Sequence, residues 1–149
     1  MTVKSAEILL VEDDPGDIEL IKESLILSKI RIDLKIVNDG VKAMSYLKKE
    51  DDYRSVEEPD LIILDLNLPM KTGMEVLEEV KSSNELKHIP IIIMTTSDQD
   101  IDILKAYKLG ANSYVTKPLG IEKFTHIVNC IEDFWLTIVK LPKRASWKQ

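Results

Sequence analysis

The chain has 149 residues, of which 44% are hydrophobic and 31% charged, and its net charge at pH 7 is −6. This length and composition are typical of one globular domain with a sizeable core, and the acidic balance argues against nucleic acid as a partner, because phosphate binding needs a basic face. A single cysteine excludes an intrachain disulfide, residues 1–7 lack a signal-peptide core, and no apolar run approaches the roughly 20 residues of a membrane span, so we expect a cytoplasmic protein without membrane contact.

Short apolar strands alternate along the chain with amphipathic segments of helix length. The predicted strands are Glu7–Val11, Leu34–Val37, Leu61–Leu64, Pro90–Thr95 and Ser113–Thr116, and the predicted helices cover 15–28, 40–49, 73–83, 98–109 and 121–139. Pro15 suits a first helical turn, Ser97 or Asp98 suits an N-cap, and Gly110 suits the position just after a helix. Continuous apolar strands are covered on both faces in parallel sheets. The pattern therefore predicts an α/β protein with three layers and a doubly wound, five-stranded parallel sheet.

Two segments lie outside this alternation. Residues 48–59 are highly charged and are predicted to form a solvated loop, and residues 141–149 form a basic tail after the helix-ending Pro142. We therefore expect one domain over residues 1–140, followed by the tail.

The last predicted helix carries more apolar surface than one contact needs. A first set of side chains, predicted to face the sheet, is Ile121, Phe124, Val128, Ile131, Trp135 and Ile138. A second set widens the apolar arc beyond the roughly 100° stripe of a surface helix, and comprises Ile127, Cys130, Phe134 and Leu141. Such an excess favours a partner surface, so we expect a homodimer through this helix, with Ile127, Phe134 and Trp135 in the interface.

Three strands end on charged residues. Ile8–Val11 leads into Glu12 and Asp13, Leu61–Leu64 into Asp65, and Ser113–Thr116 into Lys117. Because parallel strands end at the same edge of a sheet, where ligands bind, these side chains are predicted to converge on one site.

These residue types permit phosphoryl transfer with a metal. The Asp65 carboxylate is a competent nucleophile towards phosphorus, and Glu12 and Asp13 offer hard oxygen ligands that suit Mg²⁺, with Mn²⁺ as an alternative. The backbone carbonyl of Asn67 is a further candidate ligand. Lys117 suits a phosphoryl oxygen as an ion-pair partner, and hydroxyls at the end of the fourth strand, Thr95 and Thr96, can donate to the same group. We assign Asp14 and Asp60 no catalytic role.

The motifs together resemble the receiver domain of response regulators, in the CheY-like superfamily. The similar segments are ILLVEDDP (8–15), DLIILDLNLPMKTG (60–73), PIIIMTTS (90–97) and GANSYVTKP (110–118), and they extend over nearly the whole chain. The resemblance implies a flavodoxin-like strand order 2-1-3-4-5. It also implies a single-domain response regulator of a two-component system, which signals through a changed protein–protein surface and is no turnover enzyme.

The resemblance also assigns roles to individual residues. Asp65 would accept a phosphoryl group from a sensor histidine kinase, with Lys117 and Thr95 as the other catalytic residues. Asp13, Asp65 and the Asn67 carbonyl would ligate Mg²⁺, and Glu12 would act mainly through water. Thr95 and Tyr114 would form the switch, in which Tyr114 moves from an exposed to an inward position.

Three finer expectations come from the same resemblance. The Lys117–Pro118 peptide would be cis, as in that family. Thr96 stands where many receivers have a small alanine, so it bears on the rate of dephosphorylation. The loop before the third strand, the NLPMKTG turn and the ending CIEDFWLTIVKLP are similar to stand-alone regulators that partner phytochrome-type kinases. That subgroup tends to dimerise through the face formed by the fourth helix, fifth strand and fifth helix.

Three other interpretations compete with this one. A phosphohydrolase of the haloacid-dehalogenase type also uses a strand-end aspartate, but its second carboxylate would stand where this chain has Asn67. An adaptor with an inactive receiver fold would be expected to lack part of the acidic or lysine set. Phosphotransfer from His88 or His126 would require a helical bundle, so both are interpreted as surface or boundary histidines. Cys130 is interpreted as a small core or interface side chain.

Overall fold

A parallel five-stranded sheet forms the centre of the molecule. The computed structural model describes residues 5–26, 28 and 30–142. Its strands are β1 (Ser5–Val11), β2 (Arg31–Val37), β3 (Leu61–Leu64), β4 (Ile91–Thr95) and β5 (Ser113–Thr116). They lie in the order β2-β1-β3-β4-β5, and every neighbouring pair is parallel. The predicted fold class and strand order are confirmed.

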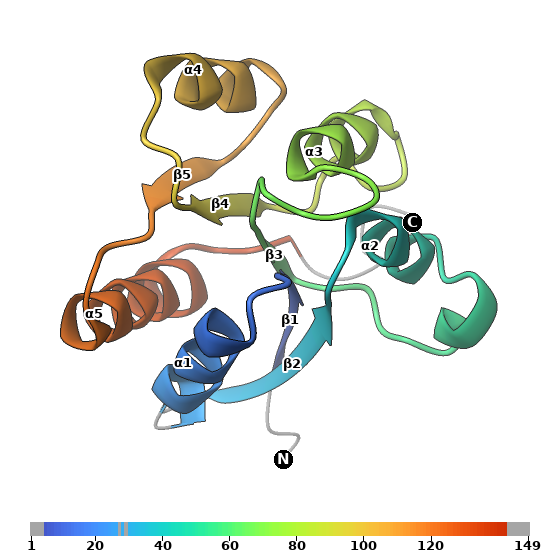
Figure 1. Ribbon diagram of the computed structural model, residues 1–149. Coiled ribbons are helices and arrows are strands. Elements are labelled where there is room, and N and C mark those ends of the chain that lie inside the picture. The colour runs from blue at the N-terminus through green and yellow to red at the C-terminus, as the bar shows by residue number, and fades with distance from the viewer. Residues whose placement is uncertain (1–4, 27, 29, 143–149) are drawn as a thin grey trace.

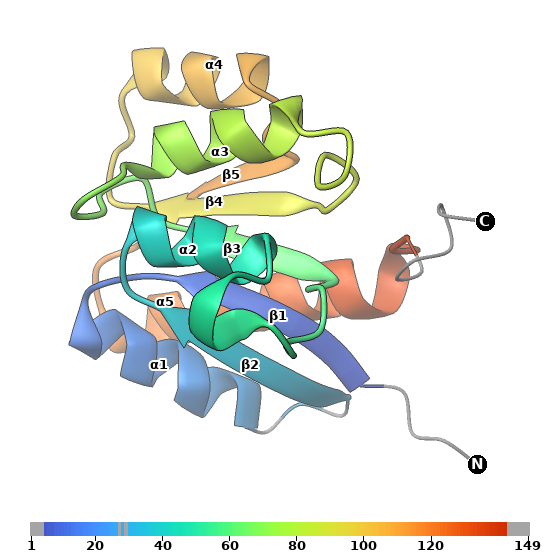
Figure 2. The same cartoon turned by 90° about the vertical axis from the view of Figure 1, so that its right-hand side faces the viewer.

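Helices cover both faces of the sheet. They are α1 (Pro15–Ile26), α2 (Gly40–Leu47), α3 (Gly73–Ser82), α4 (Asp100–Lys108) and α5 (Ile121–Glu132), with a short 3₁₀ helix η1 (Asp51–Tyr53) and a π-helix η2 (Asp133–Ile138). Helices α1 and α5 lie on one side of the sheet, and α2, α3 and α4 lie on the other (Figures 1 and 2). Among the described residues, no helix is both long and apolar enough to cross a bilayer.

The apolar strands build two cores by simple alternation of their side chains. Leu9, Val11 and Ile62 contribute to the core under α2 and α3, whereas their neighbours Ile8 and Leu10 contribute to the core under α1 and α5. All residues of β3 and β4 are buried. This two-sided burial explains why these strands are continuous apolar runs in the sequence.

The end of the chain departs from the predicted helix. Phe124, Val128 and Ile131 are buried as expected, but Ile121 and Ile138 are 68% and 71% exposed, so their assignment to the sheet-facing set is wrong. Ile138 lies outside the row of sheet-facing side chains because the π-helix η2 changes the helical period after Glu132. Ile121 is the first residue of α5, directly after the exposed Gly120.

Several local predictions can also be judged. Gly110 follows α4 with φ +108°, as predicted, but the N-cap position of α4 is Gln99, whose side chain makes no capping hydrogen bond, and not Ser97 or Asp98. The charged loop is not wholly solvated, because Tyr53 packs against the buried Tyr46 with ring centroids 5.2 Å apart. Of the predicted tail, residues 143–149 lie outside the described residues.

Candidate functional site

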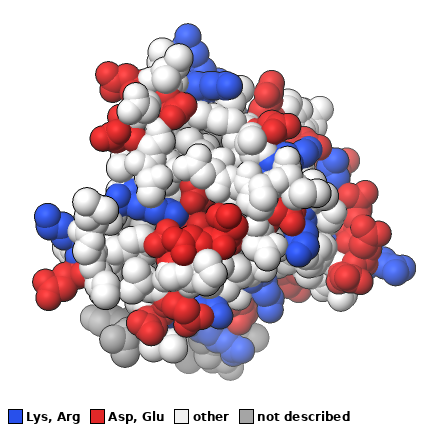
Figure 3. Space-filling view, viewed as in Figure 1, with Lys and Arg blue, Asp and Glu red and all other residues white. Residues whose placement is uncertain are grey.

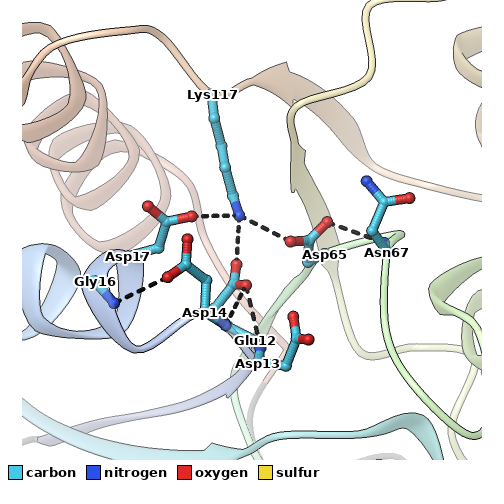
Figure 4. A network of polar contacts seen from close by, with 8 residues as sticks. All are labelled: Glu12, Asp13, Asp14, Gly16, Asp17, Asp65, Asn67 and Lys117. Carbon is cyan, nitrogen blue, oxygen red and sulfur yellow. Dashed lines mark hydrogen bonds and ion pairs between the residues drawn. The ribbon is translucent and has the colours of Figure 1, made fainter.

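Four strands deliver the predicted side chains to one edge of the sheet. Glu12 directly follows β1, Asp65 directly follows β3, Thr95 ends β4 and Lys117 directly follows β5. Figure 4 shows the carboxylates of Glu12 and Asp65 pointing towards the Lys117 ammonium. The predicted convergence of these residues is confirmed.

The Lys117 ammonium is the centre of a buried charge network. Its Nζ lies 2.6 Å from Glu12 Oε2, 2.7 Å from Asp17 Oδ2 and 2.8 Å from Asp65 Oδ2. The lysine side chain is only 5% exposed. These three carboxylates raise the pKa of Lys117 above its usual value, even though burial alone would lower it. The ammonium therefore remains charged.

Asp17 is a site residue that the sequence reasoning missed. It lies in the first turn of α1 and reaches Lys117 across 100 positions of the chain. The available signal was its place in the segment EDDPGD, because the helix that follows a functional strand begins at the same edge of the sheet.

Burial and hydrogen bonding act in opposite directions on the two central carboxyls. Burial raises the pKa of Glu12 to about 7, although Lys117 and the backbone N–H of Asp14 favour its charged form. Burial would likewise raise the pKa of Asp65, but bonds from Lys117 and from the backbone N–H of Asn67 (3.1 Å) outweigh it and lower that pKa. Of these two carboxyls, Asp65 is therefore the one that ionises more readily.

The acidic side chains suit a divalent cation. Glu12, Asp13 and Asp65 each offer a carboxylate oxygen, and these oxygens lie within 4.8 Å of one another. Figure 3 shows acidic atoms gathered near the centre of this face with a basic group beside them. Hard carboxylate oxygens in this number are what Mg²⁺ and Mn²⁺ prefer.

Two glycines, at the starts of α2 and α3, let the backbone of the segment that follows Asp65 approach these helices closely. A Cβ on Gly73 would lie 2.2 Å from the Asp65 carbonyl oxygen, and a Cβ on Gly40 would lie 2.0 Å from the Lys71 carbonyl oxygen. Thr72 caps α3 in a reciprocal capping box with Glu75. The close approach fixes the position of Asp65 relative to the start of α3.

Thr95 and Tyr114 lie on neighbouring strands beside this site. The Thr95 side chain is fully buried; its Oγ1 makes no hydrogen bond of ordinary length among the described residues, but it lies near enough to Asp65 to help lower the pKa of that carboxyl. Tyr114 is half-buried rather than exposed, because its Oη donates to the Ser97 carbonyl at 2.9 Å and its ring packs on the core. Thr96, which directly follows Thr95, is exposed.

The remaining predicted residues are placed as follows. The structure has no cis peptide among the described residues, so the Lys117–Pro118 bond is trans, the intrinsically favoured form even before proline. Asp14 and Asp60 each accept a hydrogen bond from a backbone N–H, from Gly16 and Glu7 respectively. Both carboxylates therefore serve the local structure.

The predicted interface residues differ in exposure. Phe134 is 46% exposed, whereas Ile127 and Trp135 are partly buried against the core under α5. Cys130 is exposed, so the core alternative for this residue is wrong, and its place in an interface stays a prediction.

Comparisons with known proteins agree with this geometry. The profile of the response regulator receiver domain matches residues 8–129. Response regulator Rcp1 of Synechocystis is 44% identical over 135 residues, which cover 91% of this chain and 92% of Rcp1.

Solved structures are similar over the same length. The phosphorylated cyanobacterial phytochrome response regulator RcpA matches with a TM-score of 0.92 and 44% identity, over 94% of this chain and 100% of RcpA. The Mn²⁺-bound form of Rcp1 matches with a TM-score of 0.90 and 43% identity, over 93% of this chain and 99% of Rcp1.

Proposed function

The chain belongs to the response regulator receiver domain family and is a response regulator of two-component signal transduction, and we propose that its Asp65 accepts the phosphoryl group. One observation carries the proposal: the ionised Asp65 carboxylate lies 2.8 Å from the Lys117 ammonium, with the buried hydroxyl of Thr95 close enough to help lower its pKa. A nucleophile, a cation and a hydroxyl donor at one sheet edge are the parts that phosphoryl transfer requires. Residues 1–140 form the receiver domain in this proposal.

Asp65 is the nucleophile. One of its oxygens attacks the phosphorus of a phosphohistidine on the sensor kinase, an O–P bond forms, and the P–N bond breaks with its electron pair left on the imidazole nitrogen. The product is an acyl phosphate on Asp65. The lowered pKa of this carboxyl supports the role, because the attacking oxygen is already deprotonated.

Lys117 and Thr95 receive the transferred group. The ammonium exchanges a carboxylate partner for a phosphoryl oxygen, which carries more charge than the oxygen that it replaces. The buried Thr95 hydroxyl donates to a second phosphoryl oxygen. Both residues therefore stabilise the phosphorylated form relative to the free one.

The acidic residues fit a divalent cation, Mg²⁺ or Mn²⁺. Asp13, Asp65 and the Asn67 carbonyl would hold it directly, and Glu12 would act through water. When bound, the cation neutralises the oxygens between which the phosphoryl group passes. The Mn²⁺-bound form of the relative Rcp1 supports this assignment.

The output is a changed surface. Tyr114 Oη donates to the Ser97 carbonyl, and the Ser97 hydroxyl donates to Asp102 in α4, so a movement of Thr95 and Tyr114 is connected to that helix. Exposed apolar side chains already mark the face of α4, β5 and α5; they are Ile101, Leu104, Tyr107 and Leu119. We propose that this face, with Ile127, Phe134 and Trp135, forms a homodimer and binds an unidentified downstream protein.

The partner that donates the phosphoryl group is a sensor histidine kinase of the phytochrome type in this proposal, and the setting is the cytoplasm. The phytochrome response regulators among the relatives support that choice. The chain assists its own phosphorylation and dephosphorylation without turning over a separate substrate. Thr96 stands beside the site and slows the approach of water to the acyl phosphate.

A comparison of two phosphate donors tests the function. With Mg²⁺ and acetyl phosphate, the protein should gain a hydroxylamine-sensitive phosphoryl group, as an acyl phosphate does. With p-nitrophenyl phosphate, it should release no nitrophenol over many turnovers. Sustained release would favour the phosphohydrolase, and no uptake from acetyl phosphate would favour the inactive adaptor.

A further inference from the structure

Each N–H bond of the Lys117 ammonium has its own carboxylate acceptor. A lysine offers three donors, and Nζ lies 2.6 Å from Glu12 Oε2, 2.7 Å from Asp17 Oδ2 and 2.8 Å from Asp65 Oδ2. Glu12 and Asp65 directly follow strands, whereas Asp17 reaches the ammonium from the first turn of α1 (Figure 4). Glu12 and Asp65 have roles in the proposed function, and Asp17 has none.

Asp17 differs from the other two acceptors because it has no second role at the site. Asp65 is the carboxylate that would carry the phosphoryl group, so its own oxygens change on phosphorylation. Glu12 and Asp65 both belong to the three carboxylates that suit a divalent cation, and Asp17 is not one of them. A cation held by those carboxylates would repel the ammonium. Asp17 is therefore the acceptor that can keep Lys117 in place while the rest of the site is occupied.

The contact between Asp17 and Lys117 is a charge-assisted hydrogen bond, which is stronger than a neutral one. Burial would lower the pKa of Lys117, and the largest of the effects that raise it instead is the hydrogen bond to Asp17, ahead of those to Asp65 and Glu12. The Asp17 side chain is 20% exposed, compared with 2% for Glu12 and 6% for Asp65. Asp17 can therefore be replaced while Lys117 still has two buried partners.

The start of α1 fixes the position of Asp17. The Gly16 N–H donates to Asp14 Oδ1, and the Ile18 N–H donates to the Asp14 carbonyl, both at 3.0 Å. Ile21, one turn after Asp17, is buried in the core under α1 and α5. The carboxylate thus extends from a capped and packed helix, which limits how far it can move.

We propose that Asp17 is a positioning residue for phosphoryl transfer, which holds the Lys117 ammonium where another of its N–H bonds is directed at Asp65. This use of the contact rests on the proposed function, whereas the contact itself does not. Without Asp17, only Glu12 and Asp65 hold the ammonium, and both have other partners once the site is occupied. The lysine side chain can then move away from the place where the phosphoryl oxygen needs it.

Phosphorylation kinetics test this role in the full chain. Intact mass is followed over time with excess Mg²⁺ and a fixed concentration of acetyl phosphate. The initial rate should fall about tenfold in Asp17→Asn, less than the roughly 10²-fold or more that loss of a direct donor costs. Asp14→Asn is the matched control and should keep the wild-type rate. It removes the same charge from the same segment and retains an oxygen for the Gly16 N–H.

Urea unfolding adds a measurement that needs no phosphoryl group. The wild type, Asp17→Asn, Lys117→Ala and the double variant are compared in EDTA and in Mg²⁺. If Asp17 stabilises the fold through Lys117, its replacement should matter little once the lysine is absent. The unfolding midpoint of the double variant should therefore fall by less than the sum of the two single falls, in Mg²⁺ as well as in EDTA.

Three results would overturn the proposal: an unchanged or faster rate in Asp17→Asn, an equal slowing in Asp14→Asn, or additive midpoint shifts in Mg²⁺. A faster rate would mean that Asp17 only repels the anionic donor. If the wild type takes up no phosphoryl group, the proposed function fails, and with it the role of Asp17 in transfer. Uptake by the wild type together with an unchanged rate in Asp17→Asn would overturn the positioning role alone.

Discussion

Replacing Lys117 by alanine tests how far the stability of this fold depends on the charges of its site. In Lys117→Ala, Glu12 and Asp65 stay buried, at 2% and 5% exposure, but lose the cation that they share. Loss of one partner from a buried ion pair costs about 3–5 kcal/mol. That is a large part of the roughly 5–15 kcal/mol that stabilises a typical domain. For a chain of this length, the melting temperature should fall by about 6–20 °C.

A divalent cation should reverse much of this loss. At about 100 times its Kd, a ligand of the folded state adds about 2.7 kcal/mol. The variant has a more negative site than the wild type, so it should gain more from Mg²⁺. The difference between the two proteins is therefore predicted to be largest in EDTA and smaller in Mg²⁺.

Urea unfolding, followed by far-ultraviolet circular dichroism, measures these differences. Lys123→Ala removes an exposed lysine and should change the unfolding free energy by less than about 0.5 kcal/mol. Adding Asp65→Asn to Lys117→Ala removes one uncompensated charge and should restore part of the stability. A loss below about 1 kcal/mol for Lys117→Ala in EDTA would refute the reasoning, because a buried pair should cost more than that.

Three further predictions concern Glu12, Phe134 and Gly73. Burial raises the pKa of Glu12 from 4.5 to about 7, so the folded protein keeps a proton that the unfolded chain has released. In EDTA, the free energy of unfolding should therefore fall as the pH rises through this range. This fall should be smaller in Glu12→Gln, which has no proton to lose at this position. Urea unfolding at several pH values measures both proteins, and an equal fall in the two would contradict the prediction. Phe134→Glu should weaken self-association in analytical ultracentrifugation, and a variant that remains fully dimeric would remove Phe134 from the interface. Gly73→Ala should lower the free energy of unfolding by about 1–3 kcal/mol or more, because the new Cβ would clash with the backbone of Asp65 and Leu66. Gly16→Ala is the control, since its Cβ meets only Asp14 Oδ1 at 3.5 Å; similar unfolding midpoints for both variants would refute the clash.

The sequence predicted the sheet and the convergence at its edge because both follow from local pattern. The apolar runs at 8–11, 61–64 and 91–94 are long enough to be buried strands and too short for helices. Once these strands are parallel, the charged residues at their ends must meet. Glu12, Asp65 and Lys117 needed no tertiary information beyond that rule.

Other features depend on packing that periodicity does not record. The exposure of Ile138 follows from a π-helix, whose onset after Glu132 leaves no clear mark in the apolar pattern. Asp17 joins the site through an ion pair between residues far apart in the chain. Tyr114 is half-buried because a backbone carbonyl, that of Ser97, accepts its hydroxyl.

Intact mass after incubation with Mg²⁺ and acetyl phosphate tests most directly whether Asp65 is the phosphoryl acceptor. The wild type should gain the mass of one phosphoryl group, and Asp65→Asn should gain none. The control is Asp60→Asn, whose carboxylate serves the local structure and which should still be phosphorylated. Uptake by Asp65→Asn, or no uptake by the wild type, would contradict the account.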